Sequence, residues 1–317
     1  MTPRDPDGIA AVRESSRCEV VAELLVDSRC VLGEGIVWCD RRQVAWWTDI
    51  ESSRLWRYRW ADGNARSWRV PGRVACLALC ESGRLLLGMS GGLHALDTED
   101  IEASHALQPL KLVDVPLPAA TVRINDGRVD RSGNFVFGSM DERAGRRPLG
   151  RFHQYSQRYG LRELAIEPVA IANSICFGLE GDRMYYCDSL QRRIMCCSYD
   201  AQAAAVGSPE VFAEIASPAE PDGAAIDRDG RVWSAQWGAG QVVRLGPGGR
   251  IECSIEVPAG NPSCLAFGGP AFDQILVTTA RSGIEEEGLR MQPHAGGVYR
   301  ASVVGAVGVP EVRFADQ

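Results

Sequence analysis

Lysine is nearly absent from this chain of 317 residues, because Lys111 is its only lysine among 34 basic side chains. Catalysis through a lysine Schiff base would have to use Lys111, which lies in a linker-like PLKLVDVP segment, and we do not expect it. No basic run accompanies the formal net charge of −7, which argues against a nucleic-acid or anionic-membrane partner. No uninterrupted apolar stretch approaches about 18 residues, so no membrane span is predicted.

The cysteines form no recognisable framework. There are 11 of them, an odd number, and no C-x-x-C pair occurs. We expect reduced, buried thiols, and should a disulfide exist, its first candidates are Cys18, Cys30, Cys39, Cys76 and Cys80. The N-terminus lacks an apolar core followed by a small-residue cleavage site, so we predict no secretory signal and expect a cytoplasmic protein.

The chain contains instead a repeated strand-turn-strand unit, which recurs at intervals of roughly 40 to 50 residues. Each unit has a polar turn with Gly, Asp or Arg, then an apolar or aromatic run, then a second run. The six units begin at Cys39, Glu81, Asp130, Gly181, Asp227 and Phe272. This period, with no convincing helix, is typical of a β-propeller that has one four-stranded blade per repeat. We therefore predict an all-β, six-bladed propeller.

The ends of the chain suggest how the ring closes. Residues 1–16, rich in Asp, Arg, Pro and Ser, are predicted to be a disordered lead-in, and residues 17–317 a single propeller domain. The segment Cys18–Arg29 alternates like a strand but precedes the first repeat, so we expect it to complete the last blade beside residues 296–305. Two long polar insertions are candidates for loops over a site: Gly145–Tyr155 and Glu285–Pro293.

Polar side chains stand at equivalent places just upstream of four repeats. Glu34 lies between two glycines, Arg123 and Asn125 lie in VRINDGRVD, Asn173 interrupts an apolar run, and Asp222 lies in PDGAAID. Equivalent positions in successive blades converge on the channel of a propeller, so these side chains should meet. Two carboxylates and an amide oxygen suit calcium, magnesium or manganese, whereas zinc is less favoured without His or Cys.

Each of these residues also has a purely structural interpretation. The tripeptides that begin at Asn125 and Pro221 are ordinary turn sequences, and Glu34 could be a solvated loop residue. Asn173 is harder to explain in this way, because a buried amide among Val, Ala and Ile needs a hydrogen-bond partner. The set of residues, rather than any one of them, favours a site.

Taken in order, these segments resemble the regucalcin/gluconolactonase family from about Cys30 to Arg300. The resemblance rests on E-G before a strand, R-x-N-D-G-x-V-D-x-x-G, an Asn in an apolar run, P-D-G before D-x-x-G-x-x-W, and the late TTARSGIEEEGLRMQPHAGGVY. It implies a six-bladed propeller that holds one divalent cation at the channel mouth and hydrolyses sugar-acid lactones. It also implies roles for single residues: metal ligands Glu34, Asn173 and Asp222, and substrate contacts Arg123 and Asn125.

One segment departs from the family pattern. Some members place a substrate-binding acid in the segment that reads GSMDERAGRR here, and a strict alignment puts Arg143 at that position. We assign the contact to the preceding Glu142, with Arg143 as the alternative. The sugar is left open between pentonolactones and hexonolactones.

The predicted reaction is metal-dependent hydrolysis of an aldonolactone to the aldonic acid, in carbohydrate metabolism. A cation on the carbonyl oxygen would stabilise its developing charge, and Asp222 is the candidate general base. We expect calcium, with zinc, magnesium, manganese or iron as alternatives, and a monomer or weak homo-oligomer whose partner is a small sugar lactone. The competing functions are a broader metal-dependent esterase or phosphotriesterase, and a non-catalytic calcium-binding propeller.

Three other patterns are expected to carry no chemistry. Gly88–Gly92 fits the G-x-S-x-G nucleophile motif but lies before another strand-like run, which predicts a hairpin instead of a nucleophile elbow. The DRDG at Asp227 begins like a calcium-binding loop, but Gly238 occupies its twelfth position in place of Glu, so a hairpin turn is predicted. The histidines show no ligand spacing, and none is expected to bind the metal: His94, His105, His153 and His294.

Overall fold

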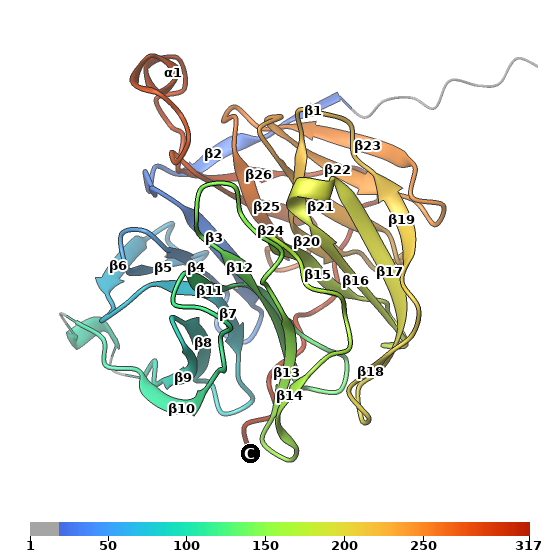
Figure 1. Cartoon of the computed structure of the whole chain (residues 1–317). Helices are drawn as coiled ribbons and strands as arrows, with labels where there is room; N and C mark the ends of the chain where they lie inside the picture. The colour runs from blue at the N-terminus through green and yellow to red at the C-terminus, as the bar shows by residue number, and fades with distance from the viewer. Residues whose placement is uncertain (1–18, 100, 105) are drawn as a thin grey trace, which may run out of the picture.

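A computed structural model describes residues 19–317 with the exception of residues 100 and 105. Its strands form six sheets of four or five strands each, arranged around one axis as the blades of a propeller (Figure 1). The first strand of each blade contacts the first strands of both neighbouring blades, so six innermost strands surround the axis. The predicted six-bladed all-β fold is confirmed.

The first three blades run in chain order from the innermost to the outermost strand. The first contains β3 (Gly33–Cys39), β4 (Val44–Asp49), β5 (Arg54–Arg59) and β6 (Ala65–Arg69). The second contains β7 (Val74–Leu79), β8 (Leu85–Met89), β9 (Gly92–Leu96) and β10 (Leu110–Asp114). The third contains β11 (Val122–Val129), β12 (Phe135–Asp141), β13 (Phe152–Ser156) and β14 (Gly160–Glu163).

The fourth and fifth blades each have a fifth strand, and the sixth has four, of which the outermost comes from the N-terminal segment. The fourth contains β15 (Ala172–Phe177), β16 (Arg183–Asp188), β17 (Arg193–Asp200), β18 (Ala205–Val206) and β19 (Glu210–Glu214). The fifth contains β20 (Glu220–Ile226), β21 (Val232–Trp237), β22 (Gln241–Leu245), β23 (Ile251–Glu256) and β1 (Glu19–Val21). The sixth contains β24 (Pro262–Gly268), β25 (Gln274–Thr279), β26 (Val298–Ala301) and β2 (Glu23–Val26).

The N-terminal segment closes the ring, as predicted, but it also pairs with a second blade. β2 pairs antiparallel with β26 of the sixth blade, which confirms the expected closure. β1 pairs in parallel with β23 of the fifth blade, which the sequence did not predict. Ala22 lies between the two strands, is buried, and donates its N–H to the Glu256 carbonyl oxygen at 2.8 Å. Two short strands therefore cover the outer edges of two neighbouring blades.

The core lies between the blades. The inner strands are buried on both faces because each blade is packed between two others, so a segment such as β4 reads VAWWTD, without polar alternation. Blades one and two share one such cluster, in which Trp46 and Leu55 pack against Leu77 and Leu87. Burial on both faces explains why the repeats appear in the sequence as apolar and aromatic runs.

Every innermost strand has a break in register with the second strand of its blade. A bulge inserts an extra residue and changes the direction in which neighbouring side chains point. The six breaks fall between Glu34 and Val37, Val74 and Cys76, Ile124 and Gly127, Asn173 and Cys176, Pro221 and Ala224, and Pro262 and Cys264. Four of the predicted site residues lie at these bulges: Glu34, Asn125, Asn173 and Asp222.

The expectation of no helix is wrong at one place. α1 (Glu286–Met291) lies within the predicted Glu285–Pro293 insertion and projects from the edge of the ring (Figure 1). Glu286 and Glu287 in its first turn and Arg290 in its last complement the helix dipole, and both acids pair with Arg290. Two short 3-10 helices are η1 (Ile101–Ala103) and η2 (Ser189–Gln191). Within the described residues, no helix has the length and apolar character needed to cross a bilayer.

The two predicted hairpins and the predicted reduced thiols are confirmed where the structure describes them. Ser90 lies exposed in the hairpin turn between β8 and β9, and no elbow forms there. The Asp227 carboxylate accepts the backbone N–H groups of Asp229 and Arg231 at 3.0 and 2.9 Å, which stabilises a hairpin turn. Of the five cysteines considered for a disulfide, Cys18 lies outside the described residues. The other four are buried free thiols: Cys30, Cys39, Cys76 and Cys80.

His153 should make the fold sensitive to acid. It is 2% exposed and stacks on Phe137 at 5.5 Å, and neither ring nitrogen has a partner among the described residues. Burial lowers the pKa of His153, so below about pH 6.5 the unfolded chain binds a proton that the folded chain resists, and stability falls. We expect His153→Phe to reduce the fall in the free energy of unfolding on acidification by up to ~1.4 kcal/mol per pH unit. Urea unfolding at pH 7 and pH 5 measures it.

The control is His294→Gln, which removes an imidazole whose side chain is 49% exposed. It should unfold with the wild-type dependence on pH. If His153→Phe also retains the wild-type dependence, the buried imidazole is not the source of the acid sensitivity.

Candidate active site

A cavity of about 300 Å³ opens among the N-terminal ends of the innermost strands. It is lined by Glu34 of β3, Asn125 of β11, Asn173 of β15 and Asp222 of β20. These residues come from blades one, three, four and five, and each lies at the bulge of its strand. The structure therefore brings together residues that are up to 188 positions apart, from Glu34 to Asp222.

A chain of hydrogen bonds fixes the amide of Asn173. Its Nδ2 donates to Ser189 Oγ at 2.9 Å, and its Oδ1 accepts from Asn125 Nδ2 at 2.8 Å. Ser189 Oγ in turn donates to the Pro221 carbonyl oxygen at 2.7 Å, one residue before Asp222. The buried amide thus has the partners that its apolar surroundings require.

Arg123 joins this network from the other side. Its Nη1 donates to Asn125 Oδ1 at 2.6 Å, and its Nε lies 3.1 Å from Glu142 Oε1. Glu142 also forms a bidentate pair with Arg73, at 2.7 and 2.8 Å. Arg123 lines the cavity, whereas Glu142 is exposed and does not line it. The substrate contact of Glu142 stays a prediction, and the alternative, Arg143, pairs with the buried Asp141 at 3.1 Å.

Glu34 and Asp222 are two of the three acids that line the cavity, and Glu220 is the third. Neither Glu34 nor Asp222 forms an ion pair with any described residue. Burial and then the nearby Asp126 carboxylate raise the pKa of Glu34 to about 8. Burial and then repulsion from Glu34 raise the pKa of Asp222 well above its usual range. The charged forms of both acids are thus destabilised, and the attraction between Arg123 and Glu34 offsets this only in part.

This donor set fits a hard divalent cation. A cation would neutralise both carboxylates, and the Asn173 amide adds a third oxygen. The described residues contain no group of three or more His, Cys, Asp or Glu side chains that could hold a metal ion. A metal centre here would therefore need the amide, and the assignment of Glu34, Asn173 and Asp222 as ligands stays a prediction.

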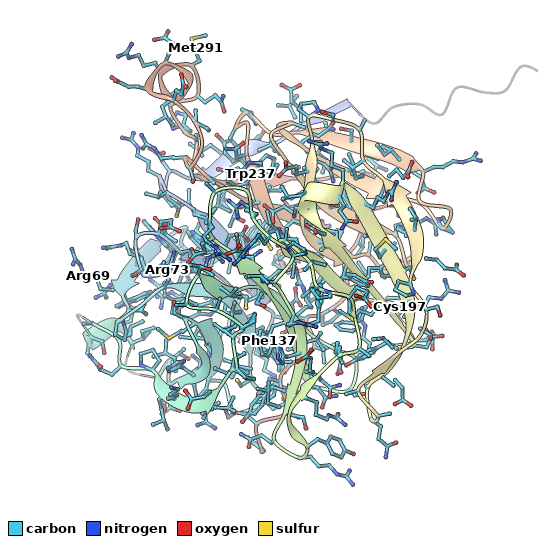
Figure 2. All side chains as sticks on the ribbon, in the orientation of Figure 1. Arg69, Arg73, Phe137, Cys197, Trp237 and Met291 are labelled. Carbon is cyan, nitrogen blue, oxygen red and sulfur yellow. The ribbon has the colours of Figure 1, made fainter. Side chains whose placement is uncertain are left out.

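Sequence reasoning missed several residues of the cavity wall. Ser189 and Leu190 belong to η2, Glu220 begins β20, and Trp237, labelled in Figure 2, ends β21. No sequence pattern identifies these residues as part of a site, because each lies at or next to the end of a strand, and the pairing of that strand determines where the residue lies. Arg146 lies within the predicted Gly145–Tyr155 loop and does line the cavity. From the second predicted loop, Glu285–Pro293, no residue lines it, although the nearby Ser282 does.

Residues 32–281 match the family described as the SMP-30/Gluconolactonase/LRE-like region. The chain is 42% identical over 297 residues to an L-arabinolactonase of Azospirillum brasilense, covering 93% of this chain and 95% of that protein. It is 31% identical to a 6-deoxy-6-sulfogluconolactonase of Pseudomonas putida, over 90% of this chain and 95% of that protein.

A solved structure shares the whole architecture. It is the regucalcin of Agrobacterium tumefaciens, described as a calcium-binding protein, with a TM-score of 0.85 and 27% identity. The similarity covers 93% of this chain and 98% of that one.

Proposed function

Because the chain belongs to the SMP-30/Gluconolactonase/LRE-like family, we propose that it hydrolyses a sugar lactone with the help of one divalent cation. The cation would be held by Glu34, Asn173 and Asp222. The observation that carries this proposal is that two carboxylates, the half-buried Glu34 and the buried Asp222, line one cavity and form no ion pair with any described residue. The lactonases among its relatives support the reaction class, a carboxylic ester hydrolysis.

The chemistry that a bound divalent cation supplies is stabilisation of the negative charge that develops on the carbonyl oxygen. Asp222 takes a proton from the water whose oxygen bonds to the carbonyl carbon. The ring C–O bond then breaks, its oxygen accepts a proton, and the product is the open-chain hydroxy acid. Burial of Asp222, which is 7% exposed, raises the pKa of its carboxyl group, and a bound cation would lower it again, so that the charged form can accept the proton.

Arg123 is placed to hold the hydroxyl groups of the substrate. Its Nε and Nη1 are occupied by Glu142, the Ile124 carbonyl oxygen and Asn125, while its Nη2 has no partner among the described residues. Because Arg123 lines the cavity, Nη2 can donate to a ligand there. The ion pair with Glu142 keeps the guanidinium in one orientation.

A panel of aldonolactones, assayed with a pH indicator with and without chelator, tests the proposed function. L-arabinonolactone is the first substrate to test, given the name of the 42% identical relative. Hydrolysis that chelator abolishes and added cation restores supports the proposal. Hydrolysis of aryl esters or phosphotriesters alone would indicate the broader hydrolase, and cation binding without hydrolysis a calcium-binding propeller. Calcium as the native ion, a cytoplasmic location and a monomeric or weakly oligomeric state stay predictions.

Arg123→Ala separates substrate binding from metal binding. Loss of a buried, charge-assisted contact should reduce kcat/KM by an amount worth roughly 1.5 to 3 kcal/mol. Cation affinity, measured by calorimetry, should stay within about threefold of wild type, because Arg123 supplies no oxygen ligand. Arg73→Ala is the control, since it removes the second partner of Glu142 while leaving Arg123 in place. A loss of cation binding in Arg123→Ala would contradict the assigned role.

A further inference from the structure

Arg146 brings a positive charge to the wall of the cavity. It is half-buried and lies in the loop between β12 and β13 of the third blade. Within the part of the chain that the structure describes, its side chain makes one weak contact, from Nη1 to Met140 Sδ at 3.8 Å. No carboxylate among the described residues forms an ion pair with it, although Glu220 lines the same cavity from the fifth blade.

The neighbouring arginines differ from Arg146 in this respect. Four arginines close to Arg146 in the sequence or in the network of Arg123 do form ion pairs: Arg73 and Arg123 with Glu142, and Arg143 and Arg147 with Asp141. A guanidinium presents a planar fork of donors that matches a carboxylate, and it is the side chain best suited to bind one. Arg146, in contrast, lines a cavity of substrate size and has no anionic partner among the described residues. A ligand bound in the cavity could supply that anion.

We propose that Arg146 binds the anionic group of a sugar acid in this cavity. The inference rests on the proposed lactonase function, because hydrolysis of a lactone releases one carboxylate per turnover. Two sources supply the same chemistry: the carboxylate formed by ring opening, and an acidic substituent carried by the lactone itself. In the first case Arg146 determines product affinity, and in the second it selects the substrate.

The experiment compares the wild type with Arg146→Met and with the control Arg147→Met. Arg147 is the adjacent arginine, its side chain is 59% exposed, and it does not line the cavity. Calorimetry with calcium present, and again after chelation, gives the Kd of L-arabinonate and D-gluconate. Kinetics give kcat/KM for the neutral D-gluconolactone and for D-glucarolactone, which carries a carboxylate at the far end.

Arg146→Met should raise the Kd of an aldonate, or lower kcat/KM for the acidic lactone, by about tenfold or more, because a charge-assisted pair is lost. The neutral lactone and the Arg147→Met control should change by less than about threefold. A change in aldonate affinity identifies the product carboxylate as the ligand, and a change confined to D-glucarolactone identifies an acidic substituent.

The proposal is overturned if Arg146→Met and Arg147→Met have equal effects on both ligands. Failure of the proposed function is distinguishable from this outcome. A wild-type protein that hydrolyses no lactone would end the lactonase proposal, while a loss of aldonate binding in Arg146→Met would still support the assignment of Arg146.

Discussion

Asp222→Asn should abolish lactone hydrolysis while leaving the fold intact. The amide has nearly the shape of the carboxylate but cannot take a proton from water, and general-base catalysis contributes about 10²- to 10⁴-fold. The amide oxygen can still approach a cation, although without charge. We therefore expect kcat to fall by at least about 10²-fold, with cation affinity weakened but measurable.

Asp222→Ala then removes the ligand oxygen as well. Its cation affinity should fall below that of Asp222→Asn, and its activity should be lost rather than shifted to a higher KM. The control is Glu220→Gln, which alters another acid on the same cavity wall. If Asp222→Asn keeps more than about a tenth of the wild-type kcat, Asp222 is not the base.

Asp222→Asn should also stabilise the protein in the presence of chelator. Asp222 is buried beside Glu34 and has no cationic partner among the described residues, so its charge costs folding free energy. Sites arranged for function commonly lower stability in this way. Differential scanning calorimetry should give a higher Tm for Asp222→Asn than for the wild type with chelator, and a smaller rise on addition of calcium.

The repeat period and the ordered motifs were sufficient to predict the blades and the residues that converge on the axis. Glu34, Asn125, Asn173 and Asp222 could be found because each is a polar residue at the same place in a different repeat. The register breaks that direct these side chains could not be predicted, because a bulge is defined by the pairing partner as well as by the strand itself.

Other features depended on contacts between distant segments. Ser189 supports Asn173 from a 3-10 turn, and Arg146 lines the cavity only because the loop after β12 folds over it. The pairing of β1 with β23 is also invisible in the sequence, since a strand of three residues has too little pattern to indicate its partner. Local sequence predicts an element, but the neighbouring blade determines what that element contacts.

Deletion of residues 1–26 should give insoluble or much less stable protein, whereas deletion of residues 1–16 should have little effect. The longer deletion removes both β1 and β2, so the outer edges of β23 and β26 lose their pairing partners. Exposed sheet edges promote aggregation, and the cost is high because the sixth blade must close the ring against the first. Solubility, urea unfolding and lactonase activity of the two proteins measure this difference.

Deletion of residues 1–21 divides the contribution between the two strands. It removes β1 but keeps β2, so β26 stays paired while β23 becomes an edge. Ala22 would lose its neighbours on one side, although its N–H could still donate to the Glu256 carbonyl oxygen. We expect a soluble, active protein with a lower urea midpoint. A soluble and fully active protein lacking residues 1–26 would show that the ring closes without either strand, because contacts between the innermost strands of blades one and six would then be sufficient.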